Sequence, residues 1–245
     1  MIKNNSLKIP ALIKTKVKKL ILKMTGRVSH LKIGVKCKHV WYGNQYGGFY
    51  VCPEFLNENS IVYSFGIGED ISFDRAIVQN NHCHVFAFDP TPKSINWIKN
   101  QDLPEKFIFF DFGVSDKSGY VDFYLPKDPH HVSGSVAVQS NINVKEKVHV
   151  KMKSVEDIIN ELGHKRIDVL KMDIEGSEYD VMESILNAKI PVTQILVEFH
   201  DRFFDNGKLK SQQIISKLNK NGYEIFGISD TYEEISFINK NHFLI

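Results

Sequence analysis

The chain has 245 residues, which fits one large α/β domain or a domain of about 200 residues with an extra N-terminal segment. Hydrophobic residues make up 42% of the sequence and charged residues 24%, so neither wholesale disorder nor a membrane bundle is indicated. The net charge of +2 is too small to indicate a nucleic-acid-binding protein, and no basic aromatic surface stands out beyond residue 40.

The chain contains three cysteines, Cys37, Cys52 and Cys83. Their odd number and wide spacing argue against a disulfide framework and fit a reducing compartment. The cysteines therefore predict a cytoplasmic protein.

The first 24 residues combine a basic and an apolar pattern. Seven lysines and no acidic residue lie between Lys3 and Lys23, interleaved with apolar residues at helical spacing. This pattern predicts a basic amphipathic helix, because the lysines interrupt both a secretory signal and a transmembrane helix. Three arrangements stay open: the helix packs on the domain, contacts an anionic membrane surface through residues 1–24, or forms a disordered tail. We expect residues 1–39 to be this helix and a lead-in, and residues 40–245 to be the main domain.

The main domain shows alternating strand and helix patterns. Aromatic and glycine residues between Trp41 and Tyr50 predict a lead-in with a short strand or two, which packs on the sheet or contacts substrate. From Ile61 onward, apolar runs alternate with helical stretches, which predicts a Rossmann-like α/β fold with a mostly parallel sheet. The predicted strands are 61–65, 84–88, 107–110, 167–172 and 194–199, and the predicted helices are 71–80, 92–100, 155–162, 178–188 and 208–221.

Two features depart from this alternation. The last two strands, 223–228 and 235–239, have no helix between them and are predicted to pair antiparallel. Earlier in the chain, 120–125 and 144–152 form a hairpin-like insertion around a polar segment that contains His130 and His131. The 126–143 loop is a candidate lid or substrate loop, on grounds of its length.

Glycines and acids recur where predicted strands end, and in open parallel sheets ligands bind at the carboxyl ends of the strands. Gly66 and Gly68 follow the first strand, where glycines permit a tight turn and a close approach of ligand to backbone. Asp89 ends the second strand, 21 residues after Gly68, the spacing at which a carboxylate accepts hydrogen bonds from ribose hydroxyls.

The residues after the glycine turn discriminate between ligands. Ile71 stands where a dinucleotide fingerprint has its third glycine or alanine, and Glu69 and Asp70 place carboxylates where a pyrophosphate needs positive charge. A cationic ligand without phosphate, such as S-adenosylmethionine, suits this turn better. A nicotinamide-dependent oxidoreductase or epimerase is the alternative.

Two further strand ends carry acidic residues and a histidine. Asp173 and Glu175 follow one strand, and Glu198 and His200 lie at the end of another. On adjacent strands these side chains would share one cleft, as a general base, as orienting carboxylates or as ligands of a divalent ion such as Mg²⁺. The alternatives are a solvated helix start for Asp173 and Glu175 and an ordinary strand-end histidine for His200.

Five segments in order resemble the FkbM family of methyltransferases: SFGIGEDISFD, FAFDPTP, FGVSDKSGYVDFYL, DVLKMDIEGSEYDVMESIL and ILVEFH. The resemblance covers roughly Gly48 to Ile238, and KMDIEGSEYDVM is its most distinctive run. It implies a seven-strand class I methyltransferase fold and S-adenosylmethionine as methyl donor. It also implies an acceptor hydroxyl on a sugar, glycan or other small metabolite.

The resemblance also implies roles for individual residues. Many members begin the glycine motif with an acid, but this chain has Ser64, so contact to the donor's amino group passes to Glu69 or Asp70. His200 is the first candidate for the general base and Asp173 the second, while Mg²⁺ bound by Asp173 is an alternative way to acidify the hydroxyl. A domain that binds the donor without turnover is a further alternative. By position, the methionine part falls to Gly66 and Gly68, the ribose to Asp89, the adenine side to Asp111 with Val114, Ser115 or Asp116, and the reacting end to Asp173, Glu175, Glu198 and His200.

Overall fold

The computed structural model describes residue 22 and residues 24–126 and 142–243. The predicted N-terminal helix and the polar segment with His130 and His131 lie almost entirely outside these residues. Within them, the chain forms a seven-stranded sheet, a three-stranded sheet and a two-stranded hairpin.

The seven-stranded sheet has the order β11-β12-β10-β9-β3-β4-β5. Strands β5, β4, β3, β9 and β10 run parallel, and β12 pairs antiparallel with both β10 and β11. This confirms the predicted α/β fold with a mostly parallel sheet and a C-terminal antiparallel hairpin. The strands are β3 (Ile61–Phe65), β4 (His84–Phe88), β5 (Phe107–Phe110), β9 (Ile167–Met172), β10 (Val192–Glu198), β11 (Tyr223–Ile228) and β12 (Glu234–Asn239).

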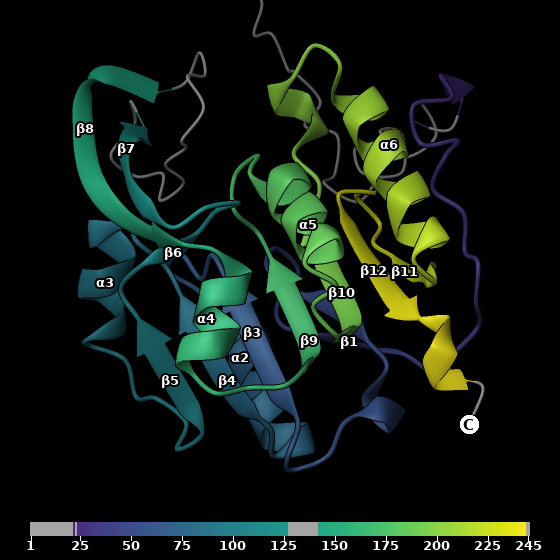
Figure 1. The fold of residues 1–245 in the computed structure, drawn as a ribbon, viewed down its shortest axis with the longest axis horizontal. Helices are drawn as coiled ribbons and strands as arrows, with labels where there is room; N and C mark the ends of the chain where they lie inside the picture. The colour runs from purple at the N-terminus through teal and green to yellow at the C-terminus, as the bar shows by residue number, and fades with distance from the viewer. Residues whose placement is uncertain (1–21, 23, 127–141, 244–245) are drawn as a thin grey trace, which may run out of the picture.

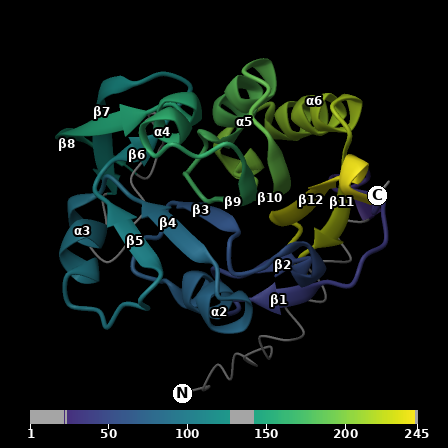
Figure 2. The same ribbon diagram turned by 60° about the horizontal axis from the view of Figure 1, so that its bottom comes forward.

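Helices cover both faces of this sheet (Figures 1 and 2). One face packs against α4, α5 and α6 and the other against α2, with Ile98 at the end of α3 buried on the α2 side. Sequence and structure agree on the helix limits to within two residues. The helices are α2 (Ser72–Asn81), α3 (Pro92–Ile98), α4 (Val155–Glu161), α5 (Glu178–Asn187) and α6 (Gly207–Lys220).

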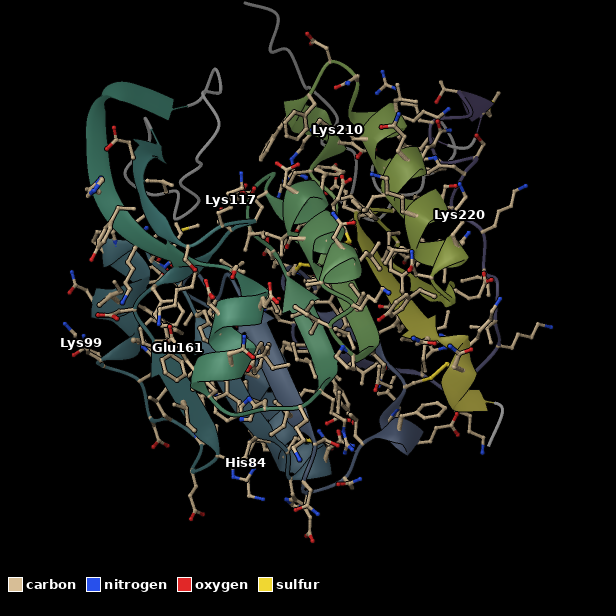
Figure 3. All side chains as sticks on the ribbon, viewed as in Figure 1. His84, Lys99, Lys117, Glu161, Lys210 and Lys220 are labelled. Atoms are coloured by element: carbon tan, nitrogen blue, oxygen red, sulfur yellow. A yellow bond between two sulfur atoms is a disulfide. The ribbon has the colours of Figure 1, made fainter. Side chains whose placement is uncertain are left out.

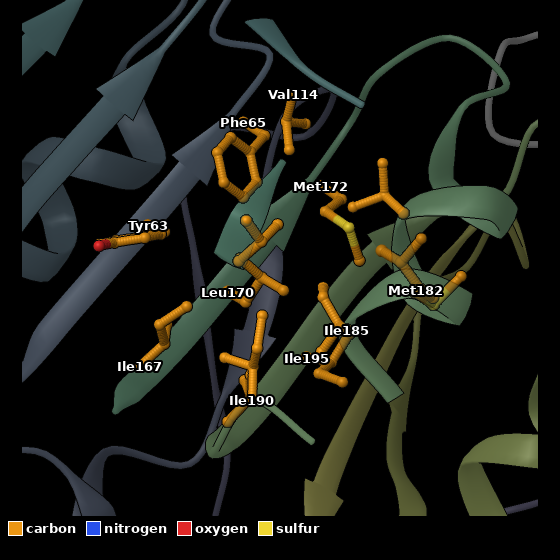
Figure 4. Close-up of a cluster of buried hydrophobic side chains, with 14 of the residues drawn as sticks. Tyr63, Phe65, Val114, Ile167, Leu170, Met172, Met182, Ile185, Ile190 and Ile195 are labelled. Atoms are coloured by element: carbon orange, nitrogen blue, oxygen red, sulfur yellow. The ribbon is translucent and has the colours of Figure 1, made fainter. Parts of the chain in front are cut away.

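The central strands are buried on both faces, as their unbroken apolar sequences predict. Leu170 and Met172 of β9 are fully buried between Phe65 of β3 and side chains of α5 such as Met182 and Ile185 (Figure 4). Long charged side chains such as those of Lys99, Lys117 and Lys220 project from the outside of the molecule (Figure 3). The rigid β3–β9 centre therefore determines where the loops after these strands lie.

The predicted insertion forms a small sheet of order β6-β8-β7. Strands β7 (Gly119–Pro126) and β8 (Ile142–Lys153) pair antiparallel, and β6 (Gly113–Val114) pairs parallel with the end of β8. The register sets Met152 opposite Gly113. This pairing brings the insertion back to the carboxyl end of the main sheet.

The lead-in forms the hairpin β1 (Val40–Tyr42) and β2 (Phe49–Val51), as predicted. It packs on the sheet through Gln194 of β10, whose side-chain amide accepts a hydrogen bond from Cys52 N at 2.8 Å and donates one to Cys52 O at 3.1 Å. The loop of this hairpin carries Tyr46 and Gly47 to the edge of the main cavity.

The expectation of no disulfide is wrong, because Cys37 and Cys52 are bonded, with their Cα atoms 6.6 Å apart. They flank the β1–β2 hairpin, which turns the chain back on itself and brings the two cysteines together. Their spacing in the sequence did not reveal this proximity. Cys83 is free and buried. Disulfides persist mainly in oxidising environments, so the argument from unpaired cysteines to a reducing compartment loses its premise. Among the described residues, no helix has the length and apolar character needed to cross a bilayer.

Reduction of the Cys37–Cys52 disulfide is expected to destabilise the protein. The bond closes a loop with a sequence separation of 15. Closing a loop of this size stabilises a fold by about 3 kcal/mol, through the lost entropy of the unfolded chain. Urea unfolding with and without a reductant measures the difference. The Cys37→Ser/Cys52→Ser double variant should have the same unfolding free energy as the reduced protein, with or without reductant. Equal stability of the oxidised and reduced wild type would contradict the expectation.

Candidate active site

A cavity of about 370 Å³ lies at the carboxyl ends of β3, β4 and β9, and we call it the main cavity because of this position. This is the place that the parallel topology predicts for a ligand. Its wall comes from the turn after β3, the segment after β4, the β6–β8 pair, the segment after β9 and the loop of the β1–β2 hairpin. The lining residues are Tyr46, Gly47, Gly66, Ile67, Gly68, Glu69, Asp70, Phe88, Asp89, Pro90, Thr91, Gly113, Val114, Met152, Asp173, Ile174, Glu175 and Ser177.

The glycine turn is packed directly against the segment after β9. Gly66 and Gly68 adopt φ angles of +75° and +53°, which favour glycine. A Cβ on Gly66 would lie 1.8 Å from the carbonyl oxygen of Asp173, so no larger residue fits there. The buried Lys171 of β9 donates a hydrogen bond from Nζ to the Gly66 carbonyl oxygen at 2.7 Å. Lys171, which the sequence analysis did not single out, thus ties the glycine turn to β9.

Replacing Gly66 by alanine is expected to destabilise the fold and to abolish ligand binding in the cavity. Gly163→Ala is the matched control, because Gly163 has a similar φ of +69° but open space around a Cβ. That control should lose only the about 1 to 2 kcal/mol of left-handed backbone strain. Urea unfolding of both variants separates backbone strain from the steric clash with Asp173. Equal losses of unfolding free energy in the two variants would contradict the packing argument.

Asp89 lines the cavity but uses both carboxylate oxygens in hydrogen bonds. Oδ2 accepts from the backbone N–H groups of Ile67 and Gly68 at 3.1 and 2.9 Å. Oδ1 accepts from the N–H and hydroxyl of Thr91 at 2.9 and 2.7 Å. Asp89 therefore braces the glycine turn against the start of α3, and its predicted contact with a ribose would add to these bonds.

The acidic pair after the glycines also lines the cavity. Glu69 forms an ion pair with Lys93 at 3.3 Å. Asp70 accepts hydrogen bonds from Ser72 N at 2.9 Å and from Asn44 Nδ2 at 2.6 Å, which joins the start of α2 to the β1–β2 loop. Their predicted contact to the amino group of a donor stays a prediction.

The predicted adenine-side residues separate into two groups. Val114 lines the cavity, whereas Asp111, Ser115 and Asp116 are not among its lining residues. The apolar wall comes instead from Val114 with Phe88, Pro90 and Met152, three residues that the sequence analysis missed. Phe88 and Pro90 flank Asp89 and could have been inferred from strand alternation, but Met152 depends on the β6–β8 register.

His200 lies at the centre of the second predicted group, with only 1% of its side chain exposed. Its Nε2 lies 3.7 Å from Asp173 Oδ1, 3.4 Å from Glu175 Oε2 and 3.5 Å from Glu198 Oε1. Asp173 and Glu175 follow β9, and Glu198 ends the adjacent β10. The structure thus brings all four predicted residues together, as their strand ends implied, and we call them with Glu178 the His200 cluster.

Glu178, the first residue of α5, is the member of the cluster that the sequence analysis missed. Its carboxylate is fully buried and lies 2.8 Å from His200 Nδ1. The same carboxylate accepts hydrogen bonds from the N–H groups of Ile174 and Gly176. The sequence analysis placed it only as the first residue of a predicted helix, and the fold shows that it also holds the histidine.

Burial and neighbouring charges shift the ionisation of the cluster. Burial raises the pKa of Asp173, and burial together with the charge of Asp173 raises the pKa of Glu198 to about 8. Burial disfavours the imidazolium of His200, but Glu178, Glu175 and Glu198 outweigh it and raise the His200 pKa to about 9. At neutral pH and without a bound cation, His200 therefore carries a proton.

A model of the methyltransferase FkbM domain matches residues 60–225 of the chain. The chain belongs to the FkbM methyltransferase family. The match spans the glycine turn, the whole His200 cluster and five parallel strands, so it confirms the resemblance in the sequence motifs. Membership in this family favours a methyltransferase over the oxidoreductase or epimerase alternative.

Three curated relatives give the range of similarity. The human probable methyltransferase-like protein 24 is 29% identical over 62% of this chain and 36% of that protein. The hexuronic acid methyltransferase AglP of Haloferax volcanii is 24% identical over 71% of this chain and 72% of that protein. The 2-O-methyltransferase NoeI of Sinorhizobium fredii is 21% identical, covering 64% and 70% respectively. The chain spans about a third of the length of the methyltransferase-like relatives from human and rat.

Among solved structures, a methyltransferase FkbM from Methylobacillus flagellatus KT is similar at 15% identity with a TM-score of 0.47. The similarity covers 75% of this chain and 44% of that one.

Proposed function

We propose that this member of the FkbM family catalyses S-adenosylmethionine-dependent methylation of a sugar hydroxyl. The observation that supports S-adenosylmethionine as the methyl donor is the charge of the main cavity. Five carboxylates line it, from Glu69, Asp70, Asp89, Asp173 and Glu175, and no lysine or arginine is among the described lining residues. A phosphate-containing dinucleotide would be repelled there, whereas a ligand with a sulfonium and an ammonium group would be attracted.

The shape of the cavity fits the same ligand. The glycine turn lets a ligand approach the backbone at Gly66 and Gly68, next to the acidic end of the cavity. Val114, Met152 and Phe88 supply an apolar wall of the kind that an adenine ring needs. When bound, S-adenosylmethionine supplies an electrophilic methyl group, and the protein supplies alignment and a proton acceptor.

The geometry favours Asp173 over His200 as the group that takes the proton from the acceptor hydroxyl. Asp173 lines the cavity directly, whereas His200 is not among the lining residues and is held at Nδ1 by Glu178. His200 Nε2 lies 3.7 Å from Asp173 Oδ1, so the histidine orients the carboxylate from behind. The hydroxyl would lie between Asp173 and the methyl group, an alignment that contributes more to rate than proton removal alone.

The names of two relatives support a sugar hydroxyl as acceptor. AglP is a hexuronic acid methyltransferase and NoeI a 2-O-methyltransferase, and each matches this chain over about two thirds of its length or more. The first name supports a sugar and the second an oxygen acceptor. The polar His200 cluster beside the cavity suits a hydroxylated acceptor.

Calorimetric titration with S-adenosylhomocysteine and, separately, with a reduced nicotinamide cofactor tests the donor. We expect saturable binding of S-adenosylhomocysteine alone. Asp89→Ala should weaken it at least about tenfold, because hydrogen bonds to a charged group contribute about 1.5 to 3 kcal/mol. Asp102→Ala is the control, since Asp102 is exposed and lies outside the cavity, and its affinity should be unchanged. Binding of the nicotinamide cofactor instead would reject the proposed donor.

Asp173→Asn is expected to lower kcat by about 10²- to 10⁴-fold, the usual contribution of a general base. Transfer of radiolabelled methyl from S-adenosylmethionine to a panel of hexuronic-acid and neutral glycans measures it. Affinity for S-adenosylhomocysteine should change little, and the exposed control Asp116→Asn should retain full activity. Unchanged turnover of Asp173→Asn at saturating acceptor would remove Asp173 from the role.

A further inference from the structure

The His200 side chain is held at one nitrogen and directed into a group of carboxylates at the other. Glu178, itself fully buried, fixes Nδ1 at 2.8 Å. Nε2 faces Asp173, Glu175 and Glu198 at 3.4 to 3.7 Å. A carboxylate that orients the far nitrogen of a histidine is the usual arrangement behind a metal-binding imidazole.

The position of His200 separates this site from an ordinary acidic surface. The side chain is only 1% exposed, Glu178 holds Nδ1, and Nε2 is fixed at 3.4 to 3.7 Å from three carboxylates. An imidazole nitrogen placed among carboxylates forms a mixed nitrogen and oxygen donor set, which suits a divalent ion.

The distances fit a shared cation. One donor atom each from Asp173, Glu175 and His200 lies within 4.8 Å of the other two. Around a cation with bonds of about 2.1 Å, neighbouring donor atoms lie about 3.0 to 3.4 Å apart, so the distances from Nε2 to Asp173 and Glu175, 3.7 and 3.4 Å, need to shorten by only a few tenths of an ångström. Glu198 lies at 3.5 Å from Nε2 but also faces Arg202, whose Nη2 is 3.4 Å from the same carboxylate oxygen.

We propose that Asp173, Glu175 and His200 bind a divalent first-row transition-metal ion at the edge of the main cavity, with Glu178 as the residue that positions His200. One imidazole nitrogen with two carboxylates suits Mn²⁺ or Zn²⁺, whereas Mg²⁺ prefers an all-oxygen set. The inference deepens the proposed function and rests on it for the ion's role, which is to hold the acceptor oxygen beside the methyl group and to acidify its hydroxyl. Asp173 would bind the ion through one carboxylate oxygen and accept the hydroxyl proton on the other. Binding of the ion itself rests on the cluster alone.

The competing interpretation is a metal-free cluster in which a protonated His200 neutralises part of the carboxylate charge. Both interpretations require the same side chains to lie close together, so only the response to a cation separates them. A metal-free cluster binds no Mn²⁺ selectively.

Electron paramagnetic resonance of free Mn²⁺, added to full-length protein previously stripped with chelator, measures binding directly. We expect one tightly bound Mn²⁺ per chain, released by an equimolar amount of Zn²⁺ and retained in equimolar Mg²⁺. Glu175→Gln should weaken Mn²⁺ binding at least about tenfold, and Glu178→Gln about 10- to 100-fold, as loss of an outer carboxylate usually does. Glu183→Gln is the matched control on α5, because Glu183 is half exposed and paired with Lys217 far from the cluster.

Titration of the same samples with S-adenosylhomocysteine keeps this inference separate from the proposed function. Donor binding without selective Mn²⁺ binding would overturn the metal site and leave the methyltransferase proposal intact. Mn²⁺ binding without donor binding would overturn the proposed function and leave the metal site intact. Mn²⁺ binding that Glu175→Gln and Glu178→Gln leave unchanged would place the ion elsewhere and would also overturn the inference.

Discussion

Gly66 and Asp173 come into backbone contact where β3 and β9 end side by side, and the absence of a Cβ on Gly66 permits that contact. The turn on one side of it forms the acidic end of the main cavity. The segment on the other side starts the His200 cluster. Lys171, buried in β9, also bonds to the Gly66 carbonyl and ties the two regions together. The distance between the glycine turn and the His200 cluster is thus set by the main chain.

The charge of the site follows from the same arrangement. Parallel strands end at one edge, so acids that follow three separate strands collect in a small volume. The cluster balances this concentration with few cations: the imidazole of His200, the ammonium of Lys171 and the guanidinium of Arg202. A site built this way attracts cations and is poorly suited to phosphate.

The sequence predicted those parts of the molecule that depend on local pattern. Unbroken apolar runs located β3, β4 and β9, and the strand-end positions of Asp173 and His200 predicted a shared cleft. The missed features depend on contacts between distant segments. Met152 reaches the cavity through strand register, Glu178 reaches His200 through the packing of α5, and Cys37 meets Cys52 because a hairpin intervenes. Sequence periodicity does not predict these contacts, because each contact depends on how two distant elements pack or pair.

Strand β8 connects the outer end of the insertion with the wall of the main cavity. From Ile142, paired with Pro126, to Met152 at the cavity wall, a fully extended strand would span at most roughly 33 Å. Pro126 and Ile142 pair at the outer end of the hairpin, whereas Met152 pairs with Gly113 at the cavity. A change at the outer end of the hairpin therefore reaches the cavity wall only through the register of β7 and β8.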